Sequence, residues 1–298
     1  MDITNSIPNY MRFLKRLNYS THTIRNYFYV LKNFAMWLEQ PIERVQSENI
    51  LEYVDFLLDK GLLPKTINCY LDIIHGFYEH LYYEEKKKVI NPVKPGYALR
   101  IPRPLPRSLK EEDVEKLFGV INRLRDQAMF RLMLRCGLRV EEVANLTVGA
   151  IDFPRRKITV KNGKWGRDRI VFISNDAHAA LLAYLAVRPV VKEKKLFLVE
   201  KGSYRGKPIS VRGIQKRIEY YARKASINCS CHCLRHTMAN LLLNADAKPT
   251  TIQEILGHDC TESIQRYCKA SNPKVRRDYF RAMEIVMQRT TPGKSEPH

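Results

Sequence analysis

A proline-rich segment interrupts the chain between residues 91 and 108 and reads NPVKPGYALRIPRPLPRS. Proline lacks a backbone N–H and restricts the residue before it, so this run resists helix formation and favours an extended linker. A chain of 298 residues is long enough to bury two ordinary cores. We therefore expect two domains that join near residues 103–107.

The residues before this segment carry helical periodicity alone. Ser20 or Thr21 offers an N-cap oxygen for one helix, and Gly61 follows the last apolar residues of another. The apolar stretches cover a segment around Tyr10 to Leu17 and residues 24–38, 48–60 and 67–81. Their spacing predicts four helices, and a bundle buries the apolar face of each.

The residues after the linker show a mixed pattern. Ser108 with Glu111 has the spacing of a capping box, and Gly137 interrupts a helical stretch. KITVKNGKWGRDRIVFI alternates apolar and polar residues on both sides of a glycine-containing loop, which predicts a β-hairpin. Gly257 is expected to stop the last of the later helices in the left-handed conformation. These helices are expected over residues 177–187, 211–224, 234–244 and 251–256.

These patterns predict a mostly α fold with a small β-sheet. We expect an N-terminal four-helix domain over residues 1–102 and a linker over residues 103–107. A mixed α+β domain is expected over residues 108–290, followed by a disordered tail over residues 291–298. No internal repeat is evident.

The charge of the chain indicates a polyanionic partner. It has 51 basic and 31 acidic residues, a formal charge of +20. A folded protein this basic is typical of nucleic-acid binding, and no interfacial amphipathic helix favours a membrane surface instead. The N-terminus has no signal-peptide pattern, so we expect a cytoplasmic protein. Seven cysteines without an export signal predict reduced thiols.

Several groups suited to phosphate binding or proton transfer stand at predicted turns. The motif CGLRVEEV carries Arg139, CHCLRH carries His232 and Arg235, and LGHDCTESIQRY carries His258 and Tyr267. Lys164 lies in the hairpin loop, with Lys161 as its competitor. Magnesium-dependent nucleases need clustered carboxylates, which this set lacks. Two guanidinium groups can instead grip the oxygens of a phosphate, and a phenol can form a covalent phosphoester.

The order and spacing of these residues resemble the tyrosine recombinase (phage integrase) family, of the two-domain Xer-like type. The resemblance covers nearly the whole chain, with residues 1–102 similar to the core-binding, SAM-like DNA-binding domain. It implies a site-specific recombinase that acts on double-stranded DNA as a homo-tetramer and passes through a Holliday junction. No cofactor, metal or ATP is expected. Both Xer-type resolution and integration or transposition by a mobile element fit this length.

The resemblance also implies a role for each residue. Tyr267 would attack a DNA phosphate to form a 3′-phosphotyrosine, and Lys164 would protonate the leaving 5′-oxygen. The remaining residues serve the phosphate and the tyrosine proton. Arg139 and Arg235 would clamp the non-bridging oxygens, His232 would handle the tyrosine proton, and His258 would hydrogen-bond the phosphate. A helix around residues 275–286 is expected to dock on a neighbouring protomer.

Other functions and sites remain as alternatives. A type IB topoisomerase shares the Arg, Lys, His and Tyr chemistry, and a decayed, non-catalytic relative would only bind DNA. Glu262-Ser263 and Lys269 depart from the residues that many relatives carry near the tyrosine. The CSCHC run, residues 229–233, invites a zinc interpretation, but its spacing favours three packed cysteines if the run is extended.

Overall fold

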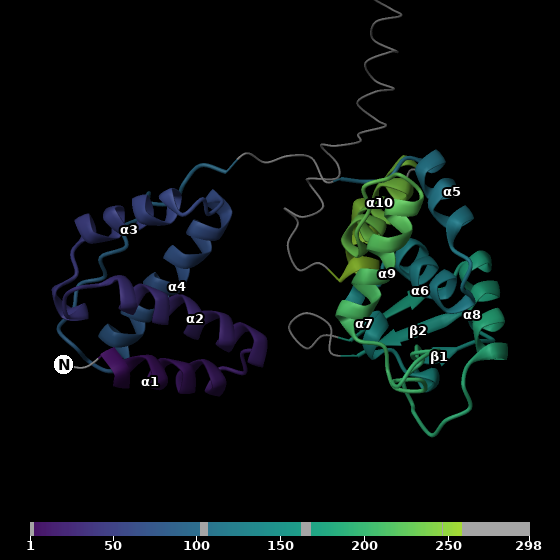
Figure 1. Cartoon of the computed structure of the whole chain (residues 1–298), viewed down its shortest axis with the longest axis horizontal. Coiled ribbons are helices and arrows are strands. Elements are labelled where there is room, and N and C mark those ends of the chain that lie inside the picture. The colour runs from purple at the N-terminus through teal and green to yellow at the C-terminus, as the bar shows by residue number, and fades with distance from the viewer. Residues whose placement is uncertain (1–2, 102–106, 162–167, 246, 258–298) are drawn as a thin grey trace, which may run out of the picture. The chain divides into compact units, whose positions relative to one another are not determined.

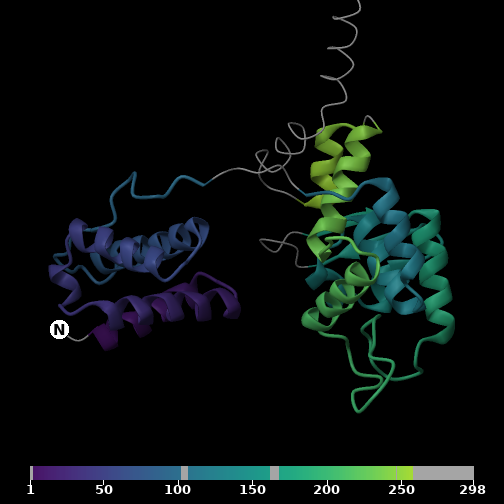
Figure 2. The same ribbon diagram turned by 45° about the horizontal axis from the view of Figure 1, so that its top comes forward.

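The structure is a computed structural model that describes residues 3–101, 107–161, 168–245 and 247–257 (Figures 1 and 2). It divides into two compact units, Met1–Arg103 and Pro104–His298, and each is described by itself. The predicted class, mostly α with a small β-sheet, is confirmed. No helix in the described ranges combines the length and the apolar character that crossing a membrane requires.

The first unit is built around its fourth helix. Helix α4 contacts α1, α2 and α3, and the apolar faces of all four meet in one core. The helices are α1 (Ile3–Arg16), α2 (Thr21–Trp37), α3 (Ser47–Asp59) and α4 (Pro64–Tyr83), with a short 3-10 turn, η1 (Ile42–Arg44), between α2 and α3. The predicted four-helix arrangement is therefore present (Figure 1).

Local signals place most of these helix ends. The Ser20 hydroxyl accepts a hydrogen bond from the Thr23 backbone N–H at 3.1 Å, as expected of an N-cap. Gly61, at φ 72°, stands after α3 in the left-handed conformation. Helix α1 begins earlier than the sequence indicates and includes Pro8. Tertiary packing supports this extra turn, because Ile7 is buried and the Lys87 ammonium donates to the Ser6 hydroxyl.

The first half of the proline-rich segment packs on the first unit, whereas residues 103–106 of the predicted linker lie outside the described residues. Val93 is buried in the core of the first unit. The Asn68 side chain on α4 donates to the Leu99 carbonyl at 2.9 Å and accepts from the Leu99 N–H at 2.8 Å. Residues 91–99 form no helix or strand and include a turn at residues 95–96. They pack on the helices, and the Asn68 amide supplies both backbone hydrogen-bond partners of Leu99.

The second unit encloses a three-stranded antiparallel sheet among helices. The predicted hairpin is confirmed: β2 pairs with β3, with Ile158 opposite Val171, and β1 pairs with β2. The elements are α5 (Glu111–Val120), α6 (Leu124–Cys136), α7 (Val140–Asn145), η2 (Val148–Ala150), β1 (Ile151–Asp152), β2 (Lys157–Val160), β3 (Arg169–Phe172), α8 (Asn175–Val187), α9 (Val211–Lys224), α10 (Cys231–Asn244) and α11 (Pro249–Leu256).

Helix α6 is the centre of this unit, and it contacts α7, α8 and α10. Gly137 ends α6 at φ 64°, and a Cβ there would lie 2.8 Å from Leu256 Cδ2 and 3.0 Å from Met238 Sδ. The end of α6 therefore lies directly against α10 and α11, where a larger residue would push the three helices apart. Helix α11 also contacts β3, which brings the sheet edge to the same place.

The predicted capping box at Ser108 and Glu111 is wrong. Helix α5 begins at Glu111 with Lys110 as its N-cap, and no side chain caps it. Three acidic residues occupy its first turn instead: Glu111, Glu112 and Asp113. Their negative charges interact favourably with the positive end of the helix dipole. Helices α8, α10 and α11 each begin two or three residues before the predicted start, whereas α9 begins at Val211 as predicted.

Candidate functional site

The carboxyl end of α11 is the point on which three arginines converge. The Arg169 Nε donates to the Ile255 carbonyl at 2.9 Å, and the Arg139 guanidinium donates to the Gly257 carbonyl at 3.0 Å. Arg235 donates to the Leu256 carbonyl and to the Gly137 carbonyl. Carbonyls at the end of a helix lack partners within the helix and carry its negative dipole, so cations satisfy both needs.

A carboxylate, Glu142, sits between two of these cations. It accepts from Arg139 at 2.8 Å and, through both oxygens, from Arg169 at 2.7 and 2.8 Å. It also accepts from the Arg139 backbone N–H at 2.7 Å, which ties it to the start of α7. Burial would raise the pKa of the Glu142 carboxyl, but the hydrogen bonds from Arg169 and Arg139 outweigh it and lower the pKa to about 2.

The charge balance of this cluster favours an anion. Three guanidinium groups stand against one carboxylate, which leaves a net charge of +2 on these four side chains. Arg235 is only 4% exposed, whereas the Arg139 side chain is 19% exposed. Partly buried cations whose positions are already set by hydrogen bonds attract a phosphate with little loss of side-chain entropy.

His232 and Arg235 share a helix turn. Because α10 begins at Cys231, both residues lie within this helix. They are three positions apart, so their side chains lie on the same face of α10, as the sequence predicts if the helix has already begun at His232. His232 is exposed, and its ring lies 5.8 Å from that of His236. Burial lowers the pKa of His236 to about 4, with His232 and Arg235 adding to the effect, so His236 is neutral at pH 7.

The remaining predicted site residues divide between described and undescribed parts of the chain. Lys164, His258 and Tyr267 lie outside the described residues. Lys161, the competing hairpin lysine, is exposed at the end of β2 and lines a cavity of about 340 Å³ together with Glu142. The structure thus brings Arg139 and Arg235 together and places His232 on the same helix as Arg235.

The CSCHC run is not extended, because α10 begins at its third residue. Cys229, Cys231 and Cys233 are all buried. Across the part of the chain that the structure describes, no three side chains of His, Cys, Asp or Glu form a group that could hold a metal ion.

Glu142 and Arg169 are site residues that the sequence analysis missed. Glu142 follows Arg139 by three residues at the start of α7, a spacing that could have indicated a cap. Arg169 is 27 residues away from Glu142 along the chain, at the first position of β3. Nothing in the hairpin pattern distinguishes it from the other basic residues of that segment.

Comparison with protein families gives two matches. The Phage integrase family matches residues 107–273, and the Phage integrase N-terminal SAM-like domain matches residues 7–88. Together they span both units of the chain.

Individual relatives agree with these matches. Tyrosine recombinase XerC of Thermodesulfovibrio yellowstonii is 32% identical over 273 residues, which cover 88% of this chain and 90% of the relative. Tyrosine recombinase XerA of Pyrococcus horikoshii is 29% identical, with 92% and 93% covered. Among solved structures, the Tn1549 transposon integrase in complex with a circular intermediate DNA has a TM-score of 0.74 at 19% identity. That match covers 95% of this chain and 99% of the integrase, and it supports the fold alone.

Proposed function

The chain belongs to the phage integrase family and is a site-specific tyrosine recombinase, and we propose that it cleaves and rejoins duplex DNA through Tyr267. The phenol oxygen attacks a backbone phosphate, the bond to the 5′-oxygen breaks, and a 3′-phosphotyrosine forms. A 5′-hydroxyl from the partner strand then reverses the step. One phosphoester replaces another, so the reaction needs no ATP.

The arginine cluster at the end of α11, which consists of Arg139, Arg169 and Arg235, binds the scissile phosphate in this proposal. Arg139 and Arg235 hold its non-bridging oxygens and stabilise the negative charge of the five-coordinate transition state. Their anchoring to adjacent carbonyls, at Leu256 and Gly257, supports this role because it fixes both guanidinium groups before DNA arrives. Glu142 accepts a hydrogen bond from the Arg139 guanidinium and so fixes the orientation of that group.

Three further residues move protons or hold the phosphate. Lys164 protonates the leaving 5′-oxygen and His258 donates to the phosphate, while His232 accepts the tyrosine proton. The exposure of His232 on the first turn of α10, one turn from Arg235, supports this assignment. Gly257 leads directly into His258, so the carbonyls that anchor the arginines adjoin it in sequence.

Both units contribute to DNA binding. The net charge of +20 supports contact with many phosphates. Relatives with solved structures include a lambda integrase dimer bound to a core site and XerH bound to a palindromic substrate. We assign residues 1–102 to a domain that binds the DNA duplex and residues 108–290 to the catalytic domain. Residues 103–107 form the linker in this proposal. A homo-tetramer performs the exchange, and residues 275–286, which lie outside the described residues, dock on the next protomer.

The observation that carries the proposal is the convergence of Arg139 and Arg235 on adjacent carbonyls at the end of α11. The test is covalent trapping with a chelator present. The protein is incubated with labelled, nicked duplexes taken from its own genomic neighbourhood, stopped with detergent and compared with Tyr267→Phe. A shifted, protease-sensitive band that requires Tyr267 is expected.

Other outcomes would contradict the proposal. A band that persists in Tyr267→Phe would assign the nucleophile to another residue, and cleavage only with added magnesium would exclude a tyrosine mechanism without metal. Relaxation of plasmids with no sequence preference would instead favour the topoisomerase alternative. Binding without cleavage on every duplex, in a protein that still folds, would favour the non-catalytic relative.

A further inference from the structure

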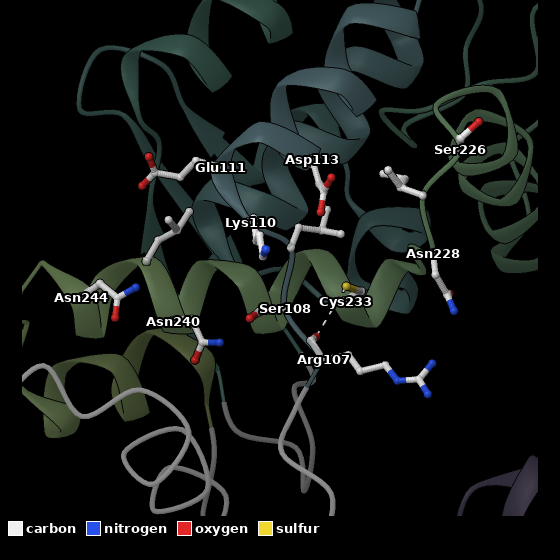
Figure 3. A pocket seen from close by; sticks show the side chains of 13 residues that line it. Arg107, Ser108, Lys110, Glu111, Asp113, Ser226, Asn228, Cys233, Asn240 and Asn244 are labelled. Carbon is white, nitrogen blue, oxygen red and sulfur yellow. Dashed lines mark hydrogen bonds between the residues drawn. The ribbon is translucent and has the colours of Figure 1, made fainter. Parts of the chain in front are cut away.

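Basic side chains line an open pocket of about 780 Å³ beside α5 and α10 (Figure 3). Two cations, Arg107 and Lys110, share this lining with two carboxylates, Glu111 and Asp113, so their charges cancel. The pocket therefore has no excess charge with which to hold a phosphate. The cluster at the end of α11 has such an excess, and its use depends on which arginine neutralises Glu142.

Two arginines contact Glu142, and they hold it differently. Arg139 stands three residues before it and gives it one hydrogen bond from the guanidinium, at 2.8 Å. Arg169 comes from the start of β3 and donates to both carboxylate oxygens, at 2.7 and 2.8 Å. Because a bidentate contact is the stronger arrangement, Arg169 is the main counter-charge of Glu142.

Arg169 is fixed and shielded by its surroundings. Its Nε donates to the Ile255 carbonyl at 2.9 Å, and a Cβ at Gly257 would lie 3.0 Å from Arg169 Cδ. The side chains of Arg169 and Glu142 are 9% and 10% exposed, against 19% for Arg139. Three of the five N–H groups of Arg169 are used in these contacts. Arg169 can therefore affect a phosphate only through its neighbours.

Arg139 keeps more of its donors for a ligand. Among the described residues, its guanidinium donates once to Glu142 and once to the Gly257 carbonyl, which leaves three of its five N–H groups. Without Arg169, Arg139 would be the remaining described cation in contact with the carboxylate. The two would then form a bidentate, neutral pair, and the Arg139 donors would turn away from the phosphate.

We propose that Arg169 is a positioning residue of the cleavage reaction, which neutralises Glu142 and so keeps the Arg139 guanidinium available for the scissile phosphate. This inference rests on the proposed function, because it assigns a phosphate to Arg139. The two hydrogen bonds from Arg169 to Glu142, in a pair shielded from water, carry it.

A pair of variants tests this role on DNA. Arg169→Gln should slow covalent trapping at saturating nicked duplex by about 10- to 100-fold, because Glu142 then competes with the phosphate for Arg139. DNA affinity should change little, since the other phosphate contacts remain. Adding Glu142→Gln to Arg169→Gln removes the competitor, so the double variant should cleave at least about fivefold faster than Arg169→Gln alone.

A purely structural role for Arg169 predicts the opposite order. A double variant as slow as Arg169→Gln, or slower, would overturn the proposal. A second comparison does not need Arg169→Gln to fold: the double variant should cleave within about threefold of the single variant Glu142→Gln. A larger further loss would mean that Arg169 acts by another route. Arg169→Lys keeps the charge and should cleave at an intermediate rate, and equal rates for lysine and glutamine would contradict neutralisation.

Phenylglyoxal, which modifies arginine, tests the availability of Arg139 without DNA. Modification there blocks trypsin and leaves a peptide spanning residues 136–155. This peptide should form about threefold more slowly in Arg169→Gln than in the wild type and recover in the double variant. The control is Arg212→Gln, which removes an exposed arginine paired with Glu219 and should leave the rate unchanged.

The two assays separate this inference from the proposed function. A wild-type protein that traps no DNA would contradict the proposed function, while the modification rates would still decide whether Arg169 controls Arg139. Equal modification of Arg139 in the wild type and in Arg169→Gln would overturn the inference even if the protein cleaves DNA.

Discussion

In the first unit the buried side chains are almost all apolar or aromatic, whereas the second unit also buries Arg125, Asp126 and Arg235. Among the described residues of the first unit, the buried polar side chains are Ser6, Ser47 and His80. Burying a charge is costly unless hydrogen bonds and counter-charges compensate for the lost hydration. The described core of the first unit is thus held by apolar packing, while the second unit also holds buried charges in fixed places.

The buried charges of the second unit fall into two groups with different consequences. Asp126 is fully buried and accepts from Arg125, Arg217 and the Tyr221 hydroxyl, none of which belongs to the arginine cluster at α11. Arg235 belongs to that cluster and adjoins the proposed phosphate site. Burial of a charge therefore does not by itself mark a phosphate site; Arg235 is proposed for one because it lies at the end of α11 in a cluster with a net positive charge.

Asp126→Asn should produce the largest loss of stability. The change keeps the side-chain volume but leaves two guanidinium groups without their counter-charge, which costs about 3–5 kcal/mol. Hydrogen exchange, followed on peptides from each unit, measures the loss. The matched variant is Tyr53→Phe in the first unit, whose buried hydroxyl has no hydrogen-bond partner among the described residues, and it should change stability little. Equal losses in both variants would contradict the comparison.

Arg235→Gln should lower the rate of DNA cleavage by about 100- to 1000-fold, because a fixed cation at the transition state is lost. Most DNA binding should remain, since one phosphate contact among many disappears. Covalent trapping and a gel-shift titration measure the two quantities. The matched control is Arg125→Gln, another buried guanidinium of the same unit, which should lose stability but keep its cleavage rate per folded molecule. Parallel loss of binding in Arg235→Gln would indicate a folding role.

Glu142→Gln should remove a pH-dependent part of the stability of the second unit. The folded pKa of Glu142 is lowered to about 2 from an ordinary value near 4.5. Its ionised form therefore stabilises the fold above about pH 4.5, and this stabilisation is lost as the pH falls through 2. The shift corresponds to about 3 kcal/mol. Unfolding in urea at pH 6 and pH 3 should show the gap between wild type and variant shrinking, while a constant gap would contradict the pairing.

Asn68→Ala should have the smallest effect, on the attachment of residues 91–99 to the first unit. The variant loses both hydrogen bonds to Leu99, a local cost of about 1–2 kcal/mol. Trypsin should then cleave faster after Arg100, which mass spectrometry detects. Lys65→Ala, an exposed position on the same helix, is the control and should cleave at the wild-type rate. Equal rates in the two variants would mean that Asn68 does not hold this segment.

Local patterns in the sequence determined the elements of this protein and the order of its motifs. Apolar spacing indicated the helices, alternation indicated the hairpin of β2 and β3, and Gly137 and Gly257 marked helix ends that are indeed left-handed. These features depend on neighbours a few residues away, so the chain itself contains the information. The predicted capping box at Ser108 is absent, and three acidic residues in the first turn stabilise this end of α5 instead.

Which distant residues meet depends on tertiary packing. Glu142 pairs with Arg169, Arg235 reaches Leu256, and Asn68 holds Leu99 because helices and strands pack in one particular way. The anchoring of the arginines at the end of α11 arises in the same manner: Gly137 lets α6 approach α10 and α11, and the orphan carbonyls there need cationic donors. A sequence motif indicates which chemical groups are present. Packing sets the distances between these groups and therefore decides which charges lie together.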